Sequence, residues 1–242
     1  MRDKATLTSS RDAASSTGDP HGPRRPAVSR RRALLLWGIA LVAMAAAVRL
    51  DPRLTQFARE RLDWLPKHVL VSFRDFGQIT PVIAVTIALT VYDRRRKLLV
   101  PTMIAATAWA GLAQGAGKLA VVRYRPNTPE VGALSPDAWT GSWSGVRWGR
   151  RPSGEQSFPS GHTCLAFAFA GVLAGFYPRV GWLFWALAAG CGLSRYVEQM
   201  HWLSDCIAGG ILGYATAWLC LLPIRRALAA QESHEAGHET HG

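Results

Sequence analysis

The sequence lacks the patterns that mark several common classes of protein. Its four cysteines show no CxxC spacing, which disfavours a zinc site, and all lie in apolar stretches where cysteine is usually a small buried side chain. There is no internal repeat of solenoid length, which disfavours a repeat protein. The apolar region also holds no cluster of histidines and carboxylates with metal-ligand spacing, so we expect neither a metal nor another cofactor.

Acidic residues are scarce, and this shortage limits the partners to be considered. The chain contains 16 Asp and Glu residues and 28 Lys and Arg residues, which gives a formal net charge of +12. Such a balance fits nucleic acid, an anionic membrane surface or an anionic substrate. Because the basic residues stand at the ends of apolar blocks instead of along one polar helix face, we expect a membrane bilayer as partner and no nucleic acid.

Long apolar blocks are present although the apolar fraction, 49%, is close to the soluble average. The blocks cover residues 33–48, 79–92, 98–122, 163–177, 180–193 and 206–222. We therefore predict an all-α, six-span transmembrane helix bundle over residues 30–226, between a disordered basic tail (1–29) and a polar tail (227–242). The arginines at 30–32 before an Ala-rich run also resemble a twin-arginine signal, so removal of the first block is an alternative.

The distribution of basic clusters predicts the orientation in the membrane. The clusters at 30–32, 94–97 and 225–226 fall on one side of a six-span serpentine, and the positive-inside rule makes that side cytoplasmic. Both termini are then cytoplasmic, in a plasma membrane of the bacterial inner-membrane type. The first outer segment carries six Lys and Arg of its own, partly offset by four Asp and Glu.

Lys118 stands inside the third block, where a charge is costly and needs a reason. Arg125-Pro126 follows seven residues later, so on a continuous helix the two cations share a face. Arg123 would point from another face, and we leave it out of the predicted site. Taken alone, the pair is better explained by cations that extend toward water at the end of a span.

Pro159-Ser160-Gly161-His162 stands directly before the fourth block. Free backbone N–H groups at a helix N-terminus, together with the hydroxyl of Ser160, form a cradle for an anion. His162 lies at the edge of this cradle. Alone, the motif is equally an ordinary helix cap with an incidental histidine.

Ser194-Arg195, His201 and Asp205 form the third motif, between the fifth and sixth blocks. His201 and Asp205 are four residues apart, so on a helix the carboxylate orients the imidazole, as the third member of a catalytic triad does. Arg195 adds a bidentate ligand for phosphate. The His/Asp pair alone is also compatible with half of a metal site.

All three motifs stand at block ends that the serpentine places on the outer side of the membrane. We therefore predict an active site at the outer (periplasmic) face.

Together the three motifs resemble the signature of the type 2 phosphatidic acid phosphatase family, which also includes vanadium haloperoxidases and acid phosphatases. The signature spans residues 118–205 without a departure, and the six blocks resemble the membrane branch. By that resemblance His201 is the nucleophile that forms a phosphohistidine, Asp205 orients it, and His162 protonates the leaving alkoxide and then activates water. The resemblance implies phosphate binding by Lys118, Arg125, Ser160, Gly161 and Arg195, whose charge replaces that of Mg²⁺ elsewhere.

The resemblance implies a metal-independent membrane phosphatase for a lipid phosphate or diphosphate, such as a polyprenyl diphosphate, phosphatidic acid, phosphatidylglycerophosphate or a lipid A phosphate. A lipid phosphotransferase, in which an alcohol replaces water, is a close variant. An anion transporter would require a repeat-related pair of broken helices, and an inactive lipid-binding protein would have lost a signature residue; the sequence shows neither. A haloperoxidase is disfavoured because the chain is short and membrane-spanning. Head-group contacts lie outside the signature, which specifies neither the lipid nor the oligomeric state.

Overall fold

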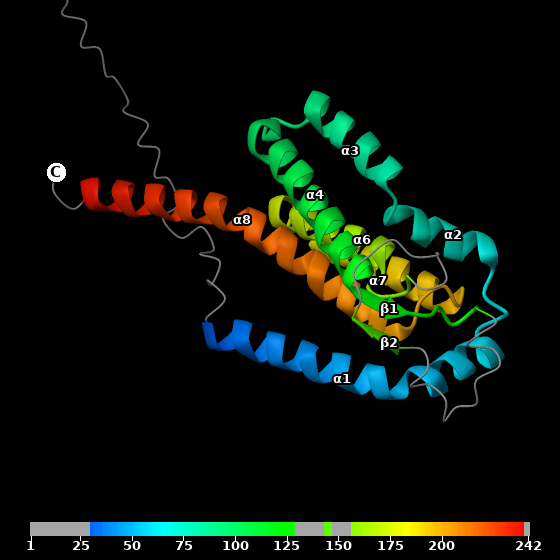
Figure 1. The fold of residues 1–242 in the computed structure, drawn as a ribbon. Coiled ribbons are helices and arrows are strands. Elements are labelled where there is room, and N and C mark those ends of the chain that lie inside the picture. The colour runs from blue at the N-terminus through cyan, green and yellow to red at the C-terminus, as the bar shows by residue number, and fades with distance from the viewer. Residues whose placement is uncertain (1–29, 129–142, 147–155, 240–242) are drawn as a thin grey trace, which may run out of the picture. The chain divides into compact units, whose positions relative to one another are not determined.

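The computed structural model describes residues 30–128, 143–146 and 156–239, and these are mainly helical, with a two-stranded sheet and short connecting turns (Figure 1). The elements are α1 (Arg30–Arg61), α2 (Lys67–Phe76), α3 (Ile79–Tyr92), α4 (Arg96–Ala120), β1 (Val121–Arg123), β2 (Trp143–Val146), α6 (Gly161–Phe176), α7 (Gly181–Val197) and α8 (Leu203–Glu239). The prediction of an all-α fold omits the sheet. The predicted tail 1–29 lies outside the described residues.

The chain divides into two compact units, Met1–Gly38 and Ile39–Gly242. In the first unit the described residues form the beginning of α1. The second unit contains all the predicted site residues.

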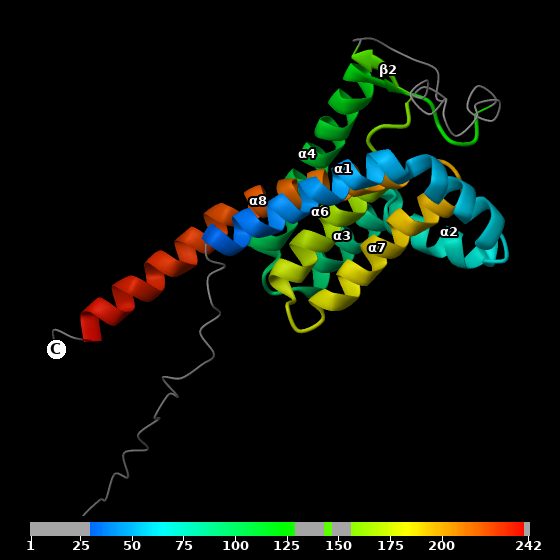
Figure 2. The same ribbon diagram turned by 90° about the horizontal axis from the view of Figure 1, so that it is seen from below.

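Helix α6 lies at the centre of the second unit, packed against α4, α7 and α8 (Figures 1 and 2). Its buried positions include small residues such as Ala166 and Ala170, which allow neighbouring helices to come close. At Gly209 of α8, a Cβ atom would lie 2.5 Å from the carbonyl oxygen of Ser160, so only glycine fits there. The backbones of α8 and of the start of α6 are therefore in direct contact.

The main apolar core joins helices α3, α4, α6 and α8. Its fully buried members are Val82, Leu99, Met103, Ala106, Phe169, Val172, Leu173 and Ala217. On the other side of α4, large apolar side chains such as Ile104, Trp109 and Leu112 are exposed. A helix that is apolar on its buried and its exposed face is typical of a membrane span.

Helix α1 continues through Pro52, beyond the end of the apolar block 33–48. Proline in a helix interior costs about 3 kcal/mol. On either side of it, Ala47, Asp51 and Ala58 are buried at helical spacing, and Ala58 packs with Tyr196 and Cys206. This continuous buried stripe stabilises the helix, because tertiary packing outweighs local propensity.

Two described helical segments are long and apolar enough to cross a membrane, Lys97–Ala120 and Leu203–Arg226. Helices α2 and α3 make a third if the pair, bent by 55°, counts as one span. Helices α6 and α7 have 16 and 17 residues, fewer than the roughly 20 of a typical span. The number of six spans therefore stays a prediction. Helix α8 extends to Glu239, through much of the segment predicted as a polar tail.

Candidate active site

The first motif is divided between a helix and a strand. Helix α4 ends at Ala120, and Val121–Arg123 forms β1, antiparallel to β2 with Val122 opposite Gly145. The prediction of one helical face for Lys118 and Arg125 is therefore wrong. The β-branched pair Val121-Val122 favours the strand, and the residue before Pro126 is excluded from the helical region.

The second motif forms the start of α6, as predicted. Ser160 is the N-cap residue and is fully buried, and its hydroxyl lies 2.9 Å from that of Thr163. A Cβ atom at Gly161 would lie 3.6 Å from Nζ of Lys118, so the first motif's ammonium group stands beside the predicted cradle. The N–H of Ser160 donates to the carbonyl oxygen of Asp205 at 3.0 Å, which joins the second and third motifs.

The third motif is a tight turn between two helices, and not one helix as predicted. Helix α7 ends at Val197 and α8 begins at Leu203, so His201 precedes the helix that carries Asp205. The carbonyl oxygen of Arg195 accepts hydrogen bonds from the N–H groups of Met200 at 3.1 Å and His201 at 3.3 Å. These bonds place His201 next to Arg195.

One hydrogen bond fixes the tautomer of His201. Its Nδ1 lies 2.7 Å from the carbonyl oxygen of Ser157, while the nearer oxygen of Asp205 is 3.8 Å away. A carbonyl oxygen only accepts, so Nδ1 carries the proton and Nε2 has the free lone pair. Burial lowers the pKa of His201, although Asp205 opposes this shift. The imidazole is therefore neutral and nucleophilic at neutral pH.

Asp205 is fully buried and held by several donors. Its Oδ2 accepts from the hydroxyl of Ser157 at 2.5 Å and from the N–H of Trp202 at 3.0 Å, and its Oδ1 forms an ion pair with Arg123. Ser157 thus contacts both members of the predicted pair, through its hydroxyl to Asp205 and its carbonyl to His201. The predicted orienting contact is mainly indirect.

Arg123 and Asp51 belong to the site's support and were not expected there. The guanidinium of Arg123 is fully buried and donates to Asp51 at 2.6 Å and to the hydroxyl of Ser204 at 2.7 Å, besides its contact with Asp205. Exclusion of Arg123 from the site was wrong because the helix does not continue to it. The signal in the sequence was Asp51, a lone carboxylate at the edge of an apolar block, which needs a partner.

Several cationic side chains with unused hydrogen-bond donors lie around His162 and His201. Nε of Arg125 and Nε of Arg195 are buried without a hydrogen-bond partner among the described residues. Burial lowers the pKa of Arg125, and the nearby positive charge of Arg195 lowers it further. Buried donors without partners and cations that repel one another favour the binding of an anion with several oxygens.

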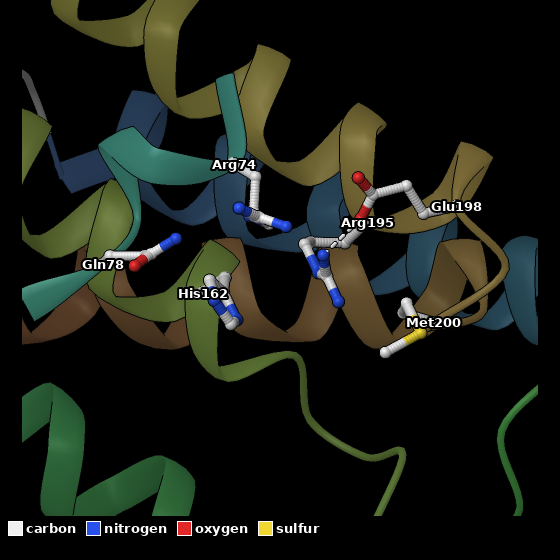
Figure 3. Close-up of a pocket in the computed structure, with 6 residues that line it drawn as sticks. All are labelled: Arg74, Gln78, His162, Arg195, Glu198 and Met200. Atoms are coloured by element: carbon white, nitrogen blue, oxygen red, sulfur yellow. Dashed lines mark hydrogen bonds and ion pairs between the residues drawn. The ribbon is translucent and has the colours of Figure 1, made fainter. Parts of the chain in front are cut away.

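A cavity of about 480 Å³ opens beside His162. Its lining comprises Arg74, Gln78, His162, Arg195, Glu198 and Met200 (Figure 3). In Figure 3 the side chains of Arg74, Gln78 and Arg195 point toward the space next to the His162 ring. Among the described residues, no three His, Cys, Asp or Glu side chains are grouped as a metal site.

A comparison with family models matches residues 82–227 to the PAP2 superfamily. The chain is 38% identical over 63 residues to the bacitracin transport permease protein BcrC of Bacillus licheniformis, which covers 26% of this chain and 31% of that protein. It is 40% identical over 67 residues to lipid A 1-phosphatase of Rhizobium johnstonii, covering 28% and 26%. The matches thus span about a third or less of these relatives.

Two solved structures share the fold. LpxE of Aquifex aeolicus superposes with a TM-score of 0.55 at 20% identity, covering 71% of this chain and 94% of that one. A transmembrane PAP2-type phosphatidylglycerolphosphate phosphatase of Bacillus subtilis gives a TM-score of 0.50 at 18% identity, covering 77% and 92%.

Proposed function

The chain belongs to the PAP2 superfamily, and from this premise we propose that it is a membrane-bound phosphatase that hydrolyses a lipid phosphate or lipid diphosphate. One relative is named a lipid A 1-phosphatase, and one structural neighbour a phosphatidylglycerolphosphate phosphatase. The observation that carries the proposal is the set of buried, unpartnered guanidinium donors of Arg125 and Arg195 beside a histidine whose Nε2 lone pair is free.

In the first step, Nε2 of His201 attacks phosphorus. Burial and the charge of Arg195 lower the pKa of His162 to about 4 in the free protein, so His162 takes up its proton when the phosphate anion binds beside it. The bond from phosphorus to the leaving oxygen breaks, and His162 gives that oxygen this proton. Lys118, Arg125 and Arg195 neutralise the phosphoryl oxygens, together with the N–H groups at the start of α6 that follow Ser160, whose own N–H is bonded to the Asp205 carbonyl. Phosphoryl transfer requires mainly such placement and charge neutralisation, and we propose that these groups act without a metal.

In the second step, water replaces the lipid. His162, now neutral, removes a proton from water as its oxygen attacks the phosphohistidine, and the P–N bond breaks. The electron pair returns to Nε2 of His201, and inorganic phosphate leaves. The Nδ1 proton stays on His201 throughout and is donated in a hydrogen bond to the Ser157 carbonyl oxygen, and the nearby Asp205 stabilises the positive ring of the phosphohistidine.

For the membrane arrangement we propose the predicted topology. Six spans, both termini on the cytoplasmic side and a site on the outer face agree with the basic clusters at 94–97 and 225–226. The bend between α2 and α3 and the short α6 and α7 explain why fewer helices reach full span length. Attachment of a reporter at each end, followed by modification from one side of the membrane, tests this arrangement.

The alternatives of transport and transfer give distinct outcomes. A transporter of this type requires two repeat-related broken helices, and the described residues contain one bent pair, α2 with α3. A phosphotransferase would move phosphate from the lipid to an added alcohol faster than to water.

The test is phosphate release by the purified full chain in detergent with EDTA, against lipid phosphates and diphosphates. A His201→Ala protein runs beside it, with Lys67→Gln as a control at an exposed position. We expect metal-independent release that His201→Ala abolishes, and a phosphohistidine that is stable to base and labile to acid. Folded wild-type protein that releases no phosphate and transfers none to alcohols would refute the proposal.

A further inference from the structure

We propose that Arg74 and Gln78 bind a second phosphate on the leaving-group side of the site, so that the preferred lipid carries another phosphate beyond the bond that is cleaved. This inference rests on the proposed function and specifies its substrate class. Neither residue belongs to the three signature motifs.

The position of His162 places the leaving group in the cavity. Since His162 protonates the leaving oxygen, the group that departs lies on the side of its ring. The cavity of about 480 Å³ opens on that side, with Arg74 and Gln78 on its wall (Figure 3). Its volume lies in the range of small-molecule sites and accommodates a head group beyond the scissile bond.

Arg74 has donors left for a ligand. Its Nε and Nη2 donate to one oxygen of Asp75, at 3.3 and 3.1 Å, and Gln78 donates to the same oxygen at 2.5 Å. Asp75 thereby holds one edge of the guanidinium and the amide in place. Nη1 of Arg74 has no hydrogen-bond partner among the described residues, so the other edge is available for a phosphate oxygen.

The corner between α2 and α3 packs directly against the backbone of His162. A Cβ atom at Gly77 would lie 2.4 Å from the carbonyl oxygen of His162 and 2.5 Å from Sγ of Cys191, so this backbone touches both α6 and α7. Arg74 and Gln78 stand on either side of Gly77. Their distance from His162 is therefore set by backbone contact.

The charges of the wall select among leaving groups. Both guanidinium groups of the wall have a carboxylate partner, Glu198 for Arg195 and Asp75 for Arg74, so Arg74 recognises an anion through its remaining donor edge at Nη1. A lipid diphosphate presents a phosphate at the leaving oxygen itself, and phosphatidylglycerophosphate presents one across a glycerol. The leaving group from phosphatidic acid is diacylglycerol, which is neutral and apolar and therefore gains nothing from a guanidinium.

The test compares kcat/KM of the full chain for a polyprenyl diphosphate, phosphatidylglycerophosphate and phosphatidic acid. Arg74→Gln is measured beside Lys67→Gln, which removes the same charge from an exposed position of the same helix. We expect Arg74→Gln to lower kcat/KM for a substrate with a second phosphate roughly 10- to 100-fold more than for phosphatidic acid, the effect of one charged hydrogen bond. Lys67→Gln leaves this ratio unchanged.

Inhibition gives a second readout without turnover. Methylenediphosphonate, which has two phosphonate groups, is expected to inhibit wild type at least about tenfold better than methylphosphonate, and Arg74→Gln to remove that advantage. Equal losses for all three lipids, or an unchanged inhibitor ratio, would overturn the second-phosphate site. Comparison of kcat/KM for the polyprenyl diphosphate and for phosphatidylglycerophosphate shows which of these two lipids the site prefers.

The two proposals fail in different ways. Wild type that hydrolyses phosphatidic acid best refutes the second-phosphate site while the phosphatase function stands. Wild type that releases phosphate from no lipid refutes the function itself.

Discussion

Replacement of Arg123 by methionine is the change whose effect the structure specifies most closely. The guanidinium is fully buried between two fully buried carboxylates, Asp51 and Asp205. Methionine replaces the unbranched stem of the side chain but not its guanidinium, and so leaves both carboxylates without their cation. Removal of one partner from a buried ion pair typically costs about 3–5 kcal/mol, because the other charge stays desolvated and unpaired.

For a chain of this length, that loss lowers the unfolding temperature by roughly 6–20 °C. The assay is thermal unfolding of the purified protein in detergent. Arg53→Met, an exposed arginine on the same helix as Asp51, is the matched control and should change little. Asp51→Asn should cost less than Arg123→Met, because the pair of Arg123 with Asp205 stays balanced.

Two results would refute this reasoning. If Arg123→Met unfolds no earlier than Arg53→Met, the buried charges do not depend on one another. If Asp51→Asn is as harmful as Arg123→Met, shape rather than charge balance holds the site together.

Further predictions concern the two histidines and their surroundings. His162→Ala should slow lipid hydrolysis about 10²- to 10⁴-fold but an activated aryl phosphate less, because that leaving group needs no proton; equal losses would contradict an acid role. Ser157→Ala should lower the unfolding temperature by the equivalent of about 1–3 kcal/mol, since Asp205 loses a donor, and reduce kcat less than His201→Ala, because the Ser157 carbonyl remains. Gly77→Ala should reduce activity and unfolding temperature, since its Cβ would overlap the His162 carbonyl oxygen; wild-type values would show that the corner is not tight. Because the pKa of folded His201 is lowered, the unfolded state binds its proton first as pH falls below about 6.5; the free energy of unfolding should then fall by up to about 1.4 kcal/mol per pH unit, and less in His201→Asn.

The sequence was informative where function depends on local spacing. The family resemblance is confirmed, and the structure brings together groups from all three motifs. Lys118 stands beside Gly161, the N–H of Ser160 bonds to the Asp205 carbonyl, and Arg195 holds the His201 backbone. Residue type and order within each motif were sufficient for this, although the first and third motifs are not single helices as predicted.

The sequence was less informative where a contact joins distant segments. The pair of Asp51 with Arg123 spans 72 residues and depends on how α1 packs. Helical periodicity placed Arg123 on the wrong face, since it did not anticipate that β1 would pair with β2. In the same way, the helix through Pro52 depends on burial, which local propensity does not express.

The contact between α8 and α6 at Gly209 makes the spacing between His162 and His201, the proposed acid and the proposed nucleophile, a property of the main chain. The backbone that leads to His162 and the helix that follows His201 meet without an intervening side chain, 2.5 Å separating the Ser160 oxygen from the missing Cβ. Substitutions elsewhere in the core, at Phe169 or Val172 for example, change packing without acting as a spacer between the two histidines. Such a chain can exchange its lipid-facing and core residues to suit different membranes while the reaction distance stays constant.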